Sequence, residues 1–292
     1  MNERIGGAVD KRSKELIPVL IASLITTLFF LVPVGISIKR SFFTFGGEFV
    51  GLDNYVMTIE SDAFQDALLY TTRLTLISIA IIVVSSVVLA MAIRRTFVGK
   101  KLMLFLLQFD IAMPSITCAS MMLIVLSQTG FTSSLFYNLG MISGYESFPD
   151  IFNDPKGYGV VLTIVWMFVP YVALSLLAVL HSISNDQEDQ AATLGVGKVR
   201  RFIHITLPSL KSSVAYTSVL CFACIFGSYE LPSLVGREHT LVTLAYYYYN
   251  DTLMTMPEYM QSYTISIILF VITTVVSGVL MYYSLLSGRG QQ

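Results

Sequence analysis

Six long apolar runs constrain this chain more than any other feature of its sequence. Crossing roughly 30 Å of hydrocarbon takes about 20 helical residues, and each run is long enough to do so. In lipid, a helix satisfies its own backbone hydrogen bonds. The runs cover residues 16–38, 74–93, 102–126, 159–180, 212–235 and 263–286. The sequence therefore predicts an all-α integral membrane protein with six transmembrane helices, in one domain that spans residues 1–292.

Composition excludes the soluble classes. Only 13% of the residues are charged and 54% are hydrophobic, whereas soluble domains carry about 25% charged residues. The net charge of −1 gives no basic footprint for nucleic acid. Cys221 and Cys224 form a C-x-x-C pair inside an apolar run, but they lack the second ligand pair of a zinc site. We expect no bound metal.

The distribution of lysine and arginine predicts the orientation of the chain. If the N-terminus is cytoplasmic, 13 of the 18 basic residues lie on the cytoplasmic side, as the positive-inside rule requires. Both termini are then cytoplasmic. The first outer segment, at about residues 39–73, is long, and Phe64 and Tyr70 suggest an amphipathic stretch that leads into the second span. We expect a multi-pass protein of the cytoplasmic (inner) membrane in contact with the lipid bilayer.

A polar island at about residues 182–211 separates the fourth and fifth spans. Asn185 and Glu188 have capping-box spacing, which predicts the start of a helix. Gly195 and Gly197 would end that helix, and a second helix would follow from about Lys198. A rigid element of this kind suits the transmission of force to a cytoplasmic partner. An interfacial helix that only anchors the bundle is the alternative.

The second helix of the island is predicted to be amphipathic and short. Pro208 should limit how far it runs before the fifth span begins. Its predicted apolar face holds Val199, Phe202 and Ile203, and its polar face holds Arg200, Arg201 and His204.

The island resembles the cytoplasmic coupling motif of permeases of type I ABC importers. That motif reads Glu-Ala-Ala, three residues, Gly, nine residues, then Ile-x-Leu-Pro. Here Asp189-Gln190-Ala191 is followed at the same spacing by Gly195 and by Ile205-Thr206-Leu207-Pro208. Aspartate stands where glutamate is usual, and Gln190 replaces the first alanine. The resemblance extends to Gly51-Leu52-Asp53-Asn54-Tyr55 in the first outer segment.

The resemblance implies that the helix before the glycine docks on a separate nucleotide-binding subunit. The residues it assigns to this coupling are Glu188, Asp189, Gln190, Ala191, Ala192, Gly195, Ile205, Leu207 and Pro208. The implied partners are a second permease subunit, favoured to be a paralogue, two ATPase subunits and an extracytoplasmic substrate-binding protein. The chain has no G-x-x-x-x-G-K-[ST] phosphate loop. We therefore expect a transport subunit, not an enzyme, that binds no cofactor itself and leaves ATP and Mg²⁺ to its partner.

Two ionisable residues lie inside predicted spans and are candidates for the solute path. Asp110 precedes Pro114, which should kink the third span. Glu230 follows Tyr229, between Gly227 and Pro232 near the outer end of the fifth span. As alternatives, Asp110 contacts a polar group of the second permease subunit, and Glu230 is merely exposed at the interface. Tyr229 is included among the path candidates.

The segments around Glu230 and at 256–260 resemble the polyamine-type branch of these permeases. Two carboxylates on a passage would suit a polycation, so a spermidine- or putrescine-type solute is the favoured hypothesis. Sugar, ferric-iron and phosphonate permeases are alternatives within the family. A self-sufficient secondary transporter should show repeated halves, and a non-transporting scaffold would have no use for an intramembrane carboxylate.

Overall fold

The computed structural model describes residues 16–182, 190–236, 239–250 and 256–289. Within them the regular secondary structure is helical, apart from an isolated bridge between Phe43 and Phe49. Helical structure begins at Leu16, passes through a π-helical turn, η1 (Thr27–Leu31), and continues as α2 to Ser41. The elements that follow are α2 (Val32–Ser41), α3 (Asp53–Glu60), α4 (Asp62–Arg94), α5 (Lys100–Ala112), α6 (Ser115–Leu126), α7 (Phe131–Asn138), η2 (Tyr145–Ser147), α8 (Tyr158–Ser182), α10 (Lys198–Arg201), η3 (Phe202–Thr206), α11 (Leu207–Phe226), α12 (Glu230–Val235), α13 (Leu241–Asn250) and α14 (Met256–Arg289).

Six helical stretches of the described chain are long and apolar enough to cross a membrane, which confirms the predicted number. They are Leu16–Ser41, Asp62–Arg94, Ser115–Asn138, Tyr158–His181, Lys198–Phe226 and Glu258–Ser284. The second begins earlier than its apolar run because the amphipathic stretch is part of the helix. Phe64 and Tyr70 are buried there, whereas Leu69 is exposed.

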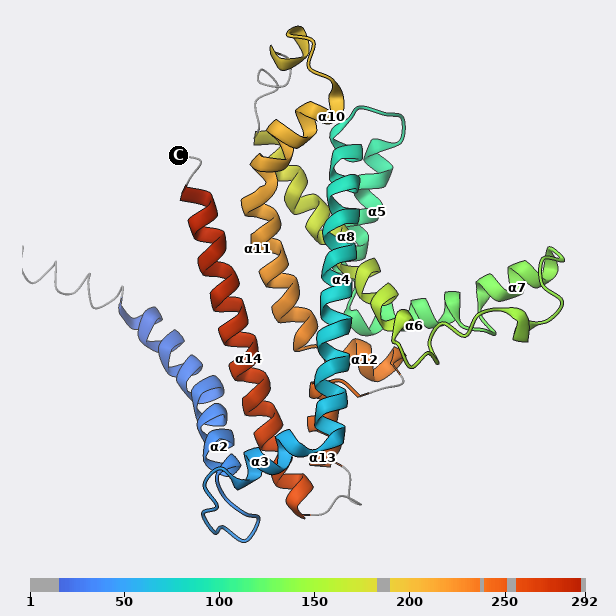
Figure 1. The fold of residues 1–292 in the computed structure, drawn as a ribbon. Coiled ribbons are helices and arrows are strands. Elements are labelled where there is room, and N and C mark those ends of the chain that lie inside the picture. Colours follow the sequence, from blue (N-terminus) through green and yellow to red (C-terminus); the bar gives the residue numbers. More distant parts are fainter. Residues whose placement is uncertain (1–15, 183–189, 237–238, 251–255, 290–292) are drawn as a thin grey trace, which may run out of the picture. The chain divides into compact units, whose positions relative to one another are not determined.

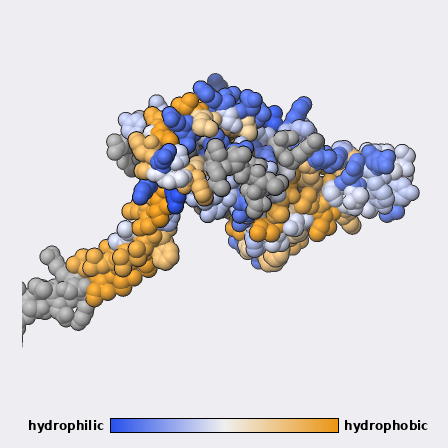
Figure 2. Space-filling view, turned by 90° about the horizontal axis from the view of Figure 1, so that it is seen from below, coloured by the Kyte–Doolittle hydropathy of each residue, from blue (hydrophilic) through white to orange (hydrophobic). Residues whose placement is uncertain are grey.

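The chain divides into two compact units. One comprises the described residues up to Ser61 together with Ala245–Ile268, and the other comprises Asp62–Leu244 together with the chain from Leu269. In the first unit, hydrophobic side chains remain exposed along the helix that ends at Ser41, as Figure 2 shows. This helix buries none of its most apolar stretch inside the chain, as expected of a lipid-facing span.

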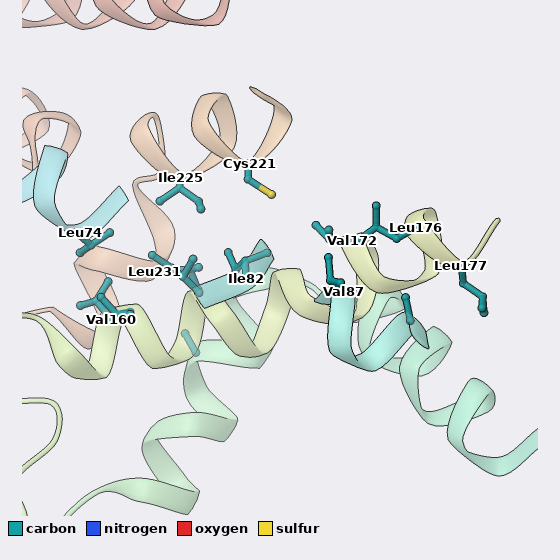
Figure 3. Packing of buried hydrophobic residues seen from close by; sticks show 14 of the residues in the cluster. Leu74, Ile82, Val87, Val160, Val172, Leu176, Leu177, Cys221, Ile225 and Leu231 are labelled. Carbon is teal, nitrogen blue, oxygen red and sulfur yellow. The ribbon is translucent and has the colours of Figure 1, made fainter. Parts of the chain in front are cut away.

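The core of the larger unit lies where α4, α8 and α11 pack together (Figure 1). Figure 3 shows Ile82 of α4, Leu176 of α8 and Ile225 of α11 among its buried side chains. Leu231 brings the short helix α12 into the same cluster. This packing holds the helices that carry the candidate site residues.

The third predicted span is broken rather than kinked. Met113 and Pro114 are extended, with ψ values of 136° and 145°, so α5 ends at Ala112 and a separate helix α6 begins at Ser115. A proline disfavours helical geometry in the residue before it and supplies no amide hydrogen. The prediction of one continuous helix over 102–126 was therefore wrong, and the apolar stretch long enough to span is Ser115–Asn138.

The fifth predicted span differs at both ends. Helical structure is continuous from Lys198 to Phe226, so Pro208 does not end the helix as predicted. The π-helical turn η3 precedes it, and the amide of Leu207 reaches back to the carbonyl of Phe202. The wider turn carries the chain into Pro208, which stands in the first turn of α11, where its missing amide hydrogen matters least. At the other end α11 stops at Phe226, and Glu230 begins the separate helix α12.

Candidate functional site

The glycine of the polar island ends a helical turn in a complete Schellman motif. The amide of Val196 donates to the carbonyl of Ala191, and the amide of Gly195 donates to Ala192, both at 3.0 Å. Gly195 has φ +78°, the left-handed conformation that a side chain disfavours by about 1–2 kcal/mol. The backbone conformation at position 195 therefore favours glycine over any other residue.

The residues on either side of this turn are open to the surroundings. Gln190 and Ala192 are exposed and Ala191 is half-buried, and no atom lies within 4 Å of the position that a Cβ of Gly195 would take. Glu188 and Asp189, the acidic start of the predicted motif, lie outside the described residues. The described part of the turn thus presents backbone and small side chains that a partner can approach closely.

The helix after the turn is only partly amphipathic in the predicted sense. Phe202 packs against the core, whereas Val199 and Ile203 are 73% and 48% exposed. Arg201, placed on the polar face, is half-buried. Of the remaining motif residues, Ile205 is half-buried and Leu207 and Pro208 are exposed. Apolar side chains left exposed next to the turn are available to lipid or to another subunit.

Asp110 is buried near the end of α5 and faces α8. It is 7% exposed, and its Oδ1 accepts a hydrogen bond of 2.9 Å from the indole Nε1–H of Trp166. Its other carboxylate oxygen is buried and has no hydrogen-bond partner in the described chain. A buried carboxylate oxygen without a donor is costly, so this group is placed to receive a hydrogen bond from outside the chain.

Glu230 links the two broken helices. It is exposed at the start of α12, and its carboxylate accepts a hydrogen bond from Oγ of Ser115, the first residue of α6. Both residues directly follow a break, at 113–114 and at 227–229. Tyr229, at the second break, is 36% exposed. Non-helical backbone at membrane depth is tolerated against protein or a water-filled cavity, so the two breaks need such surroundings.

The Gly51-Leu52-Asp53-Asn54-Tyr55 segment holds the C-terminal end of the first span within the smaller unit. Nδ2 of the buried Asn54 donates to the carbonyls of Ser41 and Phe43, each at 3.0 Å. The hydroxyls of Tyr55 and Ser41 are 2.7 Å apart. Gly51, at φ +59°, makes the turn that brings Asn54 back to the helix end. The segment satisfies carbonyls that α2 leaves unpaired as it ends.

The tyrosine run at residues 246–249 belongs in part to a packed aromatic cluster. In the smaller unit, Tyr249 stacks on Tyr259 with ring centroids 5.3 Å apart and meets Tyr263 edge-on. Phe45 also packs edge-on against Tyr259. Tyr246 and Tyr247 of the same run remain exposed.

Three of the residues that organise these sites were missed from the sequence. Neither Trp166 nor Ser115 is among the residues singled out from the sequence, and Asn54 is named there only within the Gly51–Tyr55 segment. Trp166 lies 56 positions from Asp110, and Ser115 lies 115 positions from Glu230. Only Asn54 carried a local signal, because it follows a glycine turn at a helix end.

Comparison with known proteins gives consistent matches. Residues 83–287 match the family described as "Binding-protein-dependent transport system inner membrane component". A sulfate transport system permease protein CysW from Synechococcus elongatus is 27% identical over 83% of this chain and 84% of its own length. A sulfoquinovosyl glycerol transport system permease protein SmoG from Agrobacterium fabrum is 26% identical over 79% and 77%.

A solved structure shares the fold. A chain of a bacterial ABC transporter involved in the import of the acidic polysaccharide alginate superposes with a TM-score of 0.76. Its sequence is 19% identical, and the match covers 96% of this chain and 98% of that one.

Proposed function

Because this chain belongs to the family of binding-protein-dependent transport system inner membrane components, we propose that it forms half of a solute pathway and couples it to a separate ATPase. Membership confirms a multi-pass inner-membrane transport subunit that is not itself an enzyme. The remaining partners are part of the proposal: a second permease subunit, a pair of ATPase subunits and an extracytoplasmic binding protein.

One observation carries the coupling proposal. Gly195, the glycine of the coupling motif, has a positive φ and closes a Schellman motif, with open space around it. A partner surface that receives such a turn would be sensitive to any added side chain. Helical structure runs without interruption from Lys198 into the membrane, so displacement of the turn would be transmitted along one rigid element.

The solute path is proposed to pass the two helix breaks. Asp110, Tyr229 and Glu230 lie at or beside the ends of α5 and α11 and the start of α12. Asp110 retains one buried carboxylate oxygen without a donor in the described chain. A hydroxyl of the solute would satisfy it without adding charge to the membrane.

A sugar-derived solute fits these features better than the polyamine favoured from sequence. Among the relatives compared here, one is named for sulfoquinovosyl glycerol and another for sulfate, and none for polyamines. Both carboxylates behind the polycation hypothesis have partners inside the chain, Trp166 and Ser115. Sulfate, named for the cyanobacterial relative, is the second candidate, although two nearby carboxylates would repel it.

Uptake by the assembled system tests the proposal. The full chain is produced with the proteins encoded beside its gene in a host that lacks the system, and uptake of labelled sugars, sulfate and spermidine is compared. We expect sugar uptake that stops when the ATPase subunit is omitted. Uptake that persists without the ATPase would indicate a secondary transporter and refute the coupling proposal. Spermidine uptake would refute only the solute class.

A further inference from the structure

A pocket lined by basic side chains lies where the end of α4 meets the start of α10. Its volume is about 530 Å³, and it is lined by Met91, Arg94, Arg95, Lys198, Arg201, Phe202 and Thr206. Figure 1 shows α10 beside the same end of α4. Both elements belong to the larger unit. Its described lining includes none of the residues at the helix breaks and not Gly195 itself.

The charge of this pocket calls for an anion. Of the seven described residues that line it, four carry a positive charge and none carries a negative one. They come from segments about 100 positions apart in the sequence, so the fold brings like charges together. Like charges held close together repel one another, and a bound anion relieves that repulsion.

The position and floor of the pocket indicate the source of that anion. Arg94 is the last residue of α4 and directly follows the apolar run at 74–93, so the pocket lies at the level where the membrane ends. Met91 and Phe202 give it an apolar wall beside the cations. A free phosphate has no apolar part that would pack against this wall, whereas the first carbons of an acyl chain would. With the proposed orientation, this end of α4 faces the cytoplasmic leaflet.

We propose that this basic pocket binds the headgroup phosphate of an anionic phospholipid such as phosphatidylglycerol. The exposed Arg95 and Lys198 receive the phosphate, and the acyl chain lies along Met91 and Phe202. Juxtamembrane basic clusters attract anionic lipid in this way. A lipid held between α4 and the helix that leads from the coupling turn would sense any displacement of that turn.

Lipid binding to the purified full chain tests the proposal. Detergent-solubilised protein is titrated with phosphatidylglycerol or phosphatidylcholine, and bound lipid is counted by native mass spectrometry. The pocket variant is Arg95→Gln/Lys198→Gln. The control, Lys100→Gln/Lys101→Gln, removes the same charge from the start of α5, outside the pocket lining. Neither pair lies in the buried core, so folding should be kept, and circular dichroism verifies it.

We expect the wild type and the control to prefer phosphatidylglycerol over phosphatidylcholine. The pocket variant should bind phosphatidylglycerol roughly 20- to 30-fold more weakly. Each cation near an anionic headgroup raises the affinity about fivefold, and the variant lacks two of them. Equal loss in both variants would show a general charge effect and refute the site. No lipid preference in the wild type would assign the pocket to an acidic surface of a partner or of this chain. Displacement by inorganic phosphate at the lipid's own concentration would assign it to a free anion. Each of these three results overturns the proposal.

Discussion

The indole N–H of Trp166 donates to the buried carboxylate of Asp110 at 2.9 Å, joining α8 to α5. Trp166 is itself 55% exposed, whereas Asp110 is 7% exposed. The hydrogen bond to Oδ1 holds the carboxylate in place, and Oδ2 remains able to accept another hydrogen bond. This arrangement gives the solute path proposed above a fixed acceptor next to the break at Met113 and Pro114.

Trp166→Phe should destabilise the protein because it removes the donor to Asp110. Hydrogen bonds to charged groups contribute about 1.5–3 kcal/mol, so we expect a lower melting temperature in detergent. Adding Asp110→Asn should recover part of the loss, since a neutral amide costs less to bury than a carboxylate. The four proteins of this double-mutant cycle are compared by thermal unfolding. Strictly additive effects would show that the two side chains do not interact.

Glu230→Gln should impair transport more than it impairs stability. The amide keeps a hydrogen bond with Ser115 but loses the charge at the start of α12. The measurement is uptake of the identified solute at several concentrations, with Glu60→Gln, an exposed position on α3, as the control. Unchanged KM and kcat in Glu230→Gln would remove this residue from the path.

Asn54→Asp should loosen the outer end of the first span. The side-chain amide of Asn54 donates to two carbonyls. A carboxylate in its place has no donor and would repel both carbonyl oxygens. Two buried bonds lost, with repulsion added, should cost roughly 2–4 kcal/mol. The neighbouring exposed Asp53→Asn is the matched control. Limited proteolysis of membrane vesicles from the outer side reads the change, and equal cleavage of both variants would contradict the role given to Asn54.

The predicted orientation places Val98 in the cytoplasm and Phe49 outside. Both side chains are well exposed, at 103% and 70%, so a cysteine at either position is accessible to a maleimide that does not cross membranes. In intact cells we expect labelling of Phe49→Cys but not of Val98→Cys, and the reverse in inverted vesicles. The unmodified chain controls for its three native cysteines. The opposite pattern would invert the topology.

Hydropathy predicted the helical spans because each apolar run needs a lipid or protein environment along its whole length. The same signal continues across Met113 and Pro114, so it does not distinguish a kinked helix from two helices. Pro208 predicted a helix end that the structure does not have, because the π-helical turn at 202–206 accommodates the proline. The glycines at 195 and 197 predicted a turn, and Gly195 does have a positive φ, whereas its role in coupling stays a prediction. Partners such as Trp166 and Ser115 depend on which helices pack together, and a single sequence does not contain that information.

The most direct test of the central claim compares Gly195→Ala with Gly197→Ala in the purified complex. Gly195 needs φ +78°, whereas Gly197, two residues away, has φ −62° and ψ 155°, which alanine adopts without strain. Neither position has an atom within 4 Å of an added Cβ. The chain has no phosphate loop of its own, so ATP hydrolysis that co-purifies with it reports on the partner. We predict that transport-coupled ATP hydrolysis is lost in Gly195→Ala and kept in Gly197→Ala. Equal hydrolysis and uptake in both variants would contradict coupling through this turn.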